Sequence, residues 1–147
     1  MRTRLASEDS GFTLVELLVV VLVIGVLAAI ALAMFSTQKQ KGQDADAKSN
    51  ASALVSAVDR CYVDTGDFTA CDGTGPNDEL GKTNLPIGAG REQVSVTAAT
   101  FNTFTVTATS AADDHFIVSQ GPTSTQTHTC DAGAAGNSGG GCTDGSW

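Results

Sequence analysis

A long apolar run near the amino terminus dominates the hydropathy pattern of the chain. From Leu17 to Phe35 there are 19 consecutive residues without a charged side chain. At a rise of about 1.5 Å per residue, a helix over this run is about 28 Å long, close to the hydrocarbon thickness of a bilayer. A single carboxylate, Glu16, stands immediately before the run. The pattern predicts a membrane-spanning helix with a charged residue at its edge.

Two ordinary explanations of such a run have to be weighed. A secretory signal peptide would use Arg2 and Arg4 as its basic start and Ala31-Leu32-Ala33 as its cleavage pattern. The run exceeds the roughly 7 to 15 apolar residues usual for that class, and Glu16 stands at its beginning. A plain single-span anchor explains the length of the run, but not the residues that precede it.

The helix is expected to continue beyond the apolar run. Lys39 and Lys41 mark a boundary with water, and apolar residues then recur at spacings of three and four, which is typical of one helix face. These residues are Ala51, Leu54, Val55, Val58, Cys61 and Tyr62. Gly66 is a plausible stop. The pattern predicts one helix from about Phe12 to Asp64.

The second half of the chain changes to a strand pattern. Residues 65–90 are rich in glycine and proline and indicate an irregular loop. Apolar and polar residues then alternate over 94–98, 104–108 and 116–119, which predicts three antiparallel strands with one buried face. Residues 123–130 are a further extended piece that would add an edge. The fold class is α+β, with the strands laid on the helix stripe.

Four cysteines suggest two disulfide bonds. A membrane-targeted chain places them in an oxidising compartment, and four cysteines allow three pairings. Short separations favour Cys61 with Cys71 and Cys130 with Cys142. The first bridge would staple the loop to the helix end, and the second would close most of the glycine-rich tail.

Charge and side-chain chemistry point away from several functions. The formal net charge of −8 argues against a nucleic-acid surface. The adjacent Asp113, Asp114 and His115 indicate a solvated turn rather than an acid–base pair. No nucleophile–base arrangement or phosphate-binding glycine motif is present, so we expect no enzyme activity and no cofactor. Zinc could be bound by His128, Cys130 and Cys142, and calcium by the oxygen-bearing side chains of Asp72, Asn77, Asp78 and Glu79. The spacing of neither set matches a common metal-binding pattern. The sequence therefore predicts no metal site.

The residues Gly11-Phe12-Thr13-Leu14-Val15-Glu16, followed by the apolar run, resemble the start of type IV pilins and of type II secretion pseudopilins. The resemblance implies a leader, residues 1–11, that a prepilin peptidase removes by cutting between Gly11 and Phe12, and it implies methylation of the new Phe12 amine. Residues 12–35 would then form the transmembrane and filament-core helix. Residues 36–147 would form its continuation and a pilin-like head with a disulfide-bounded terminal loop.

The resemblance also implies a function. Glu16 would pair with the Phe12 amine of a neighbouring subunit, as the chain polymerises into a type IV pilus. The expected partners are like subunits, the prepilin peptidase, the pilus assembly machinery and the inner membrane, with no nucleic acid. The chain would sit in the cytoplasmic membrane before assembly and in an extracellular filament afterwards. The alternatives are a pseudopilin of a type II secretion system and a membrane-anchored binding protein that never polymerises. Glu16 is expected to discriminate, since a simple anchor has no need of it.

Overall fold

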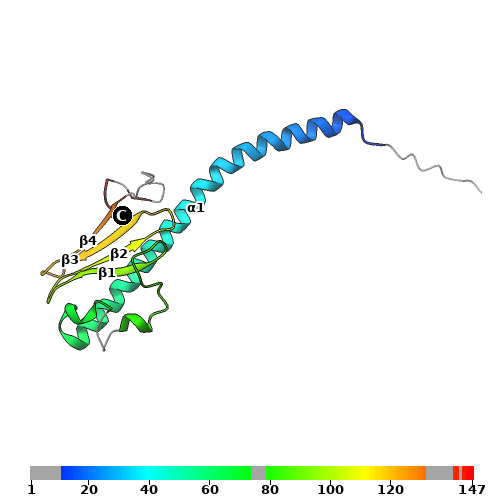
Figure 1. The fold of residues 1–147 in the computed structure, drawn as a ribbon. Coiled ribbons are helices and arrows are strands. Elements are labelled where there is room, and N and C mark those ends of the chain that lie inside the picture. The colour runs from blue at the N-terminus through cyan, green and yellow to red at the C-terminus, as the bar shows by residue number, and fades with distance from the viewer. Residues whose placement is uncertain (1–10, 74–78, 132–140, 143) are drawn as a thin grey trace, which may run out of the picture. The chain divides into compact units, whose positions relative to one another are not determined.

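The computed structural model describes residues 11–73, 79–131, 141–142 and 144–147. The chain forms two compact units that divide between Ser36 and Thr37. The helix α1, Leu14–Thr65, contributes to both units (Figure 1). The prediction of one helix from about Phe12 to Asp64 is therefore confirmed, with each end displaced by one or two residues.

The carboxyl end of α1 has a regular glycine cap. Gly66 has a φ of +72°, and its amide donates to the Tyr62 carbonyl at 2.7 Å. A residue in the left-handed conformation just past a helix, with this hydrogen bond, satisfies one of the last free carbonyls. Glycine adopts the conformation without the penalty of a Cβ atom. The predicted stop at Gly66 is thus explained by the backbone.

A four-stranded antiparallel sheet follows, in the order β1-β2-β3-β4 (Figure 1). The strands are β1 (Val94–Ala99), β2 (Phe104–Thr109), β3 (His115–Gln120) and β4 (Gln126–Asp131). The three predicted strands are confirmed within a residue or two. The extended piece over 123–130 is the edge strand β4, which pairs with β3 in the sheet. Neighbouring strands are sequential, so short turns make all the connections.

The core lies between the second half of α1 and one face of the sheet. The helix contributes the buried stripe Ala47, Ala51, Leu54, Val55, Ala57, Val58 and Cys61, and the strands contribute Val94, Phe104, Val106, Ala108, Phe116, Val118 and Cys130. Period 3.6 on the helix and period 2 on the strands place these residues on single faces. The α+β fold with a helix against a small antiparallel sheet is confirmed.

The predicted loop over 65–90 contains two short 3-10 helices, η1 (Phe68–Cys71) and η2 (Glu79–Lys82). Asp67 caps η1 by accepting a hydrogen bond from the Thr69 amide at 2.8 Å. The Phe68 ring stacks on Tyr62 with 4.1 Å between centroids, and it meets Phe104 at 4.8 Å. These aromatic contacts join η1 to the end of α1 and to β2.

Candidate functional site

Thr13 and Glu16 hold the entry to α1 through reciprocal hydrogen bonds. The Thr13 hydroxyl donates to Glu16 Oε2 at 2.9 Å, and the Thr13 amide donates to the same oxygen at 3.2 Å. The Glu16 amide in turn donates to Thr13 Oγ1 at 3.2 Å. This arrangement is a capping box, in which the N-cap residue and the third helical residue satisfy each other's amides. Glu16 therefore stabilises the start of the helix within its own chain.

Sequence reasoning gave Glu16 a partner on a neighbouring subunit and missed its partner on its own chain. The signal was present, because Thr-x-x-Glu ahead of an apolar run is the sequence pattern of a capping box. Any membrane helix benefits from such a cap. The role of Glu16 as the residue that separates an assembling subunit from a simple anchor therefore stays a prediction, since the cap gives this carboxylate a second use.

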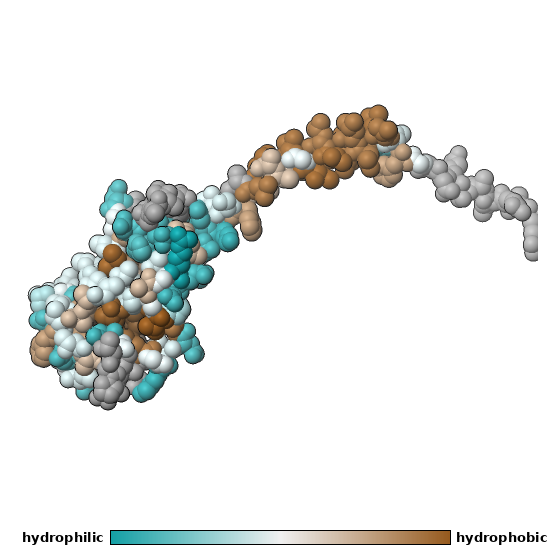
Figure 2. Space-filling view, viewed as in Figure 1, coloured by the Kyte–Doolittle hydropathy of each residue, from teal (hydrophilic) through white to brown (hydrophobic). Residues whose placement is uncertain are grey.

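The apolar run behind the cap is exposed on every side. In this single chain, the exposed fractions of its large apolar side chains run from 47% at Val23 to 71% at Leu32. Figure 2 shows hydrophobic side chains covering the visible surface of this part of α1. Among the described residues, one helix is long and apolar enough to cross a membrane. A continuous apolar surface of this size has to be covered by lipid or by protein.

Gly11 and Phe12, the residues expected to flank the cleaved bond, both precede α1 and are exposed. A bond ahead of the first helical turn is free of intrahelical hydrogen bonds. The leader residues 1–10 lie outside the described residues. The structure thus leaves the bond accessible, and cleavage itself stays a prediction.

Both favoured cysteine pairs are bonded in the structure. Cys130 and Cys142 form the bridge that closes the tail, as expected, with 5.7 Å between their Cα atoms. Cys61, on the last turns of α1, is joined to Cys71 at the end of η1, with a Cα separation of 5.8 Å. With the four sulfurs engaged in this way, Cys130 and Cys142 offer no thiolate to a zinc ion.

The carboxyl-terminal residues return to the core beside the second bridge. The Cys130 amide donates to the Gly145 carbonyl at 2.9 Å, and the Trp147 ring meets Phe116 edge to face at a centroid distance of 5.8 Å. Lys48 of α1 places its Nζ 5.0 Å from the Phe116 ring centre and donates to the Gly141 carbonyl at 3.2 Å. The lysine and the aromatic rings pin a tail that its glycine content would leave loose.

A buried carboxyl group lies where the core begins on α1. Asp44 is 1% exposed, and neither of its carboxylate oxygens accepts a hydrogen bond of good geometry. Burial is the largest cause that raises the pKa of Asp44, and the nearby Asp114 carboxylate raises it further. The Ser110 hydroxyl and the charge of Lys48 act in the opposite direction and lower it. Asp114 is 3% exposed, so the prediction of a solvated turn was wrong at this residue.

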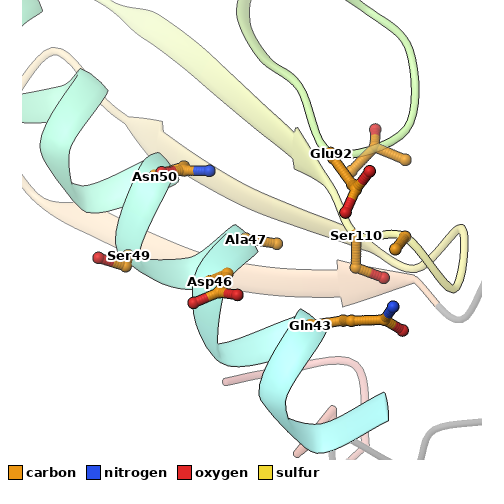
Figure 3. A pocket seen from close by; sticks show the side chains of 9 residues that line it. Gln43, Asp46, Ala47, Ser49, Asn50, Glu92 and Ser110 are labelled. Carbon is orange, nitrogen blue, oxygen red and sulfur yellow. The ribbon is translucent and has the colours of Figure 1, made fainter. Parts of the chain in front are cut away.

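An open polar pocket of about 310 Å³ lies beside this cluster, between α1 and the loops at one end of the sheet. Figure 3 shows the amides of Gln43 and Asn50 projecting from α1 toward the wall that carries Glu92 and Ser110. The lining residues are Gln43, Asp46, Ala47, Ser49, Asn50, Glu92, Thr109, Ser110 and Ala111. Among the described residues that line it, the charged groups are the carboxylates of Asp46 and Glu92, so this lining is acidic. Sequence reasoning did not find it, because its walls are far apart in the chain.

The other candidate chemistry is dispersed. His128 packs edge to face on Trp147, with 4.6 Å between ring centres. Asp113 pairs with Arg91 at 3.3 Å, and His115 Nδ1 lies 3.1 Å from the Thr109 hydroxyl. Of the calcium candidates, Asn77 and Asp78 lie outside the described residues. Among the residues that the structure describes, no three histidine, cysteine or acidic side chains converge on one point.

Comparison with known proteins adds to this geometry. Residues 7–32 match the prokaryotic N-terminal methylation motif. The chain is 42% identical over 55 residues to the type IV major pilin protein PilA of Myxococcus xanthus, which covers 37% of this chain and 25% of that protein. It is 33% identical over 94 residues to a fimbrial protein of Pseudomonas aeruginosa, which covers 60% of each chain. It is 39% identical over 73 residues to a fimbrial protein of Moraxella nonliquefaciens, which covers 46% of this chain and 47% of that one.

These matches span only part of each relative, between a quarter and three fifths of its length. No solved structure matches the chain. The capped apolar helix, continued against a four-stranded antiparallel sheet, defines a pilin-like protein. The methylation motif and the similarity to pilin and fimbrial proteins support the resemblance to type IV pilins that was seen in the sequence.

Proposed function

We propose that the chain is a structural subunit of a type IV pilus, which polymerises through the first half of α1 into a surface filament. The observation that carries this proposal is the exposed apolar surface of residues 12–35, which no element of the chain covers within the described residues. In the cytoplasmic membrane lipid covers this surface. In a filament the same surface of neighbouring subunits replaces the lipid, which leaves the heads in water.

Processing supplies the charge for this assembly. A prepilin peptidase cuts between Gly11 and Phe12 and methylates the new amine, and the assembly machinery draws the mature subunit from the membrane. The Phe12 amine then carries a positive charge into an apolar surrounding. A buried ammonium is costly alone and tolerable beside a carboxylate. The carboxylate of Glu16 on the adjacent subunit supplies the opposite charge. To reach the amine, this carboxylate gives up its hydrogen bonds to Thr13 of its own chain.

The relatives favour a pilus over the alternatives. Those compared here carry the names pilin and fimbrial protein, whereas a pseudopilin would build a short periplasmic structure for protein export. Two disulfide bonds and a cysteine-closed tail suit a head that is exposed outside the cell. We therefore assign the filament, and not a catalytic reaction, as the role of the chain.

The test is the recovery of filaments from the cell surface. Sheared material should contain thin filaments in electron micrographs, and the intact mass of their subunit should correspond to a chain that starts at a methylated Phe12 with two disulfide bonds. A mature protein that starts at Met1, or after Ala33, contradicts the proposal. So does a correctly processed protein that never leaves the membrane fraction.

A further inference from the structure

Lys48 holds the carboxyl-terminal tail against the core from its place on α1. Its Nζ donates to the Gly141 carbonyl at 3.2 Å, and it lies 5.0 Å from the centre of the Phe116 ring and 5.7 Å from that of Trp147. An ammonium near aromatic faces gains a favourable electrostatic contact. Gly141 has a φ of +95°, and a Cβ atom at this position would lie only 2.9 Å from Lys48 Nζ. The tail is therefore shaped to receive this ammonium.

Asp44 stands four residues before Lys48 on the same helix. An aspartate followed by a lysine at this spacing is in the favourable order for an ion pair on a helix. In the structure the pair is not made. Asp44 is 1% exposed, and neither of its carboxylate oxygens has a hydrogen-bond partner among the described residues. The lysine is directed to the tail, and the carboxyl group is left behind in the core.

The surroundings of Asp44 favour its neutral form. Ser110 and Asp114, which are 1% and 3% exposed, lie beside it in the turn between β2 and β3. The turn is held in shape, because Ser110 Oγ accepts hydrogen bonds from the amides of Ala112 and Asp114, both at 3.2 Å. A buried carboxylate without a partner is costly, and a second carboxylate beside it adds to the cost. Burial accordingly raises the pKa of Asp44, so this group keeps its proton while the tail is in place.

The other titratable groups around this contact have partners of their own. Asp113, on the same turn, pairs with Arg91 at 3.3 Å. His128 of β4 packs edge to face on Trp147, with 4.6 Å between ring centres, and Asp59 of α1 lines a small pocket together with His128. Because His128 contacts the tail, its protonation has to be separated from that of Asp44 in any measurement.

We propose that the proton on Asp44 is a pH-sensitive latch, which sets the position of Lys48 and, through Lys48, that of the tail. While Asp44 is protonated it has no charge to attract the ammonium, and Lys48 stays on Gly141 and the aromatic rings. When the proton leaves to water, the carboxylates of Asp44 and Asp114 together draw the ammonium back toward the helix. The tail then loses the contact that seats it on the core.

The direction of the effect follows from proton binding. With the tail seated, Asp44 keeps its proton at pH values where a released form, closer to the ordinary aspartate pKa of about 3.9, has lost it. Between these two pKa values the seated form binds more protons, so the released population rises by up to about tenfold for each pH unit. The latch is closed in acid and opens as the pH rises.

Hydrogen exchange of the Cys130 amide, followed by NMR, measures how well the tail is seated. This amide donates to the Gly145 carbonyl at 2.9 Å, so the seated tail protects it from exchange. In the detergent-solubilised full chain, its protection factor should fall between pH 5 and 8, by up to about tenfold per pH unit. In Asp44→Asn, which has no proton to lose at this position, the protection should stay high over the whole range.

Three further variants separate the latch from other causes. Asp46→Asn is the matched control, because it removes an exposed carboxylate from the same helix, and it should follow the unaltered chain. Lys48→Met keeps an unbranched apolar stem without the charge, so the protection should be lower at every pH and should no longer fall with pH. His128→Phe removes the titrating group that touches Trp147 and should leave the pH dependence unchanged. Protected amides in β2 and β3 check that each variant is folded.

Three results would overturn the latch. The first is a Cys130 protection factor that does not change with pH in the unaltered chain. The second is a fall with pH that persists in Asp44→Asn, because another group would then control the tail. The third is a fall that persists in Lys48→Met, because the lysine would then not transmit the change. The measurement uses no filaments, so its outcome is independent of the proposed function.

Discussion

The Thr13 hydroxyl and the Glu16 carboxylate are 2.9 Å apart, and the Glu16 amide returns a hydrogen bond to the same hydroxyl at 3.2 Å. Glu16 thus has two possible tasks, to cap its own helix and to neutralise an amine on a neighbouring subunit. The two tasks have different chemical requirements. A cap needs an oxygen acceptor, which glutamine also supplies, whereas neutralisation needs a negative charge.

Thr13→Val removes the cap and keeps the charge. The loss of an N-cap side chain costs about 1 kcal/mol of helix stability, which falls on the first turn and not on the head. We expect this variant to be processed and to build filaments at close to the normal yield, measured by shearing and by a blot of the sheared fraction. A loss of filaments as severe as that caused by removing the Glu16 carboxylate would show that the cap is the essential contact.

Processing is checked by intact mass. We expect the membrane-bound form to lose residues 1–11 and to gain one methyl group on the Phe12 amine before any filament forms. Gly11→Val should block the cut, because the bond then no longer follows a glycine, and the leader should stay on the protein. A Gly11→Val protein of mature mass would refute the cleavage position.

The two disulfide bonds should have separable effects. Replacing both Cys61 and Cys71 by alanine frees η1 from the helix end and should lower the free energy of unfolding by about 3 kcal/mol. Replacing both Cys130 and Cys142 should mainly release the tail. Trp147 is the single tryptophan and packs on Phe116, so its fluorescence should shift toward that of a solvated indole in the second variant only.

Non-reducing peptide mapping of the unaltered protein provides the control for those variants. It should recover Cys61 linked to Cys71, and Cys130 linked to Cys142. A peptide that joins Cys71 to Cys130 would contradict the pairing, and the stability differences between the two variants would then need another explanation.

Asp44 should make the head less stable as the pH rises. Burial raises the pKa of Asp44, so the folded chain keeps the proton at pH values where the unfolded chain, with an aspartate pKa of about 3.9, has lost it. Between these two pKa values the folded state binds more protons, and the free energy of unfolding falls with increasing pH. Asp44→Asn should flatten this fall and raise the stability at pH 7, by on the order of 1 kcal/mol.

Denaturant unfolding of the full chain in detergent, at several pH values between 4 and 8, measures this effect. Asp64→Asn, at an exposed position near the end of the same helix, is the matched control and should behave like the unaltered protein. If Asp44→Asn and the unaltered chain show the same pH dependence, then Asp44 ionises freely in the folded head.

The architecture was predictable because it is encoded locally. The apolar stripe from Ala51 to Cys61 has the period of a helix, and the alternation in Phe104–Thr109 has the period of a strand. Each element can therefore be predicted from a short stretch of sequence. The cap at Gly66 was also visible, since glycine after the last periodic residue is a common stop. The capping box of Thr13 and Glu16 is equally local, because Thr-x-x-Glu ahead of an apolar run is its sequence pattern.

The remaining features depend on contacts between distant residues. Asp44 looks like one more solvated residue of a polar segment, and only the sheet laid over it makes it buried. Trp147 reaches Phe116 because the tail folds back after Cys142. The acidic pocket exists because Asp46 on the helix and Glu92 before β1 meet across the fold. Sequence periodicity does not predict such contacts between distant residues, because they depend on how the helix and the strands pack together.

The most direct test of the account is the filament yield of Glu16→Gln, sheared from cells and compared with the amount of the same variant in the membrane fraction. Glutamine keeps the shape and the cap but leaves the buried Phe12 amine unneutralised, which for a broken buried pair costs about 3 to 5 kcal/mol at each added subunit. We predict a processed, disulfide-bonded protein that stays in the membrane and forms few or no filaments, with Glu16→Ala behaving in the same way. A normal filament yield from Glu16→Gln would contradict the claim that this carboxylate is the charge that drives assembly.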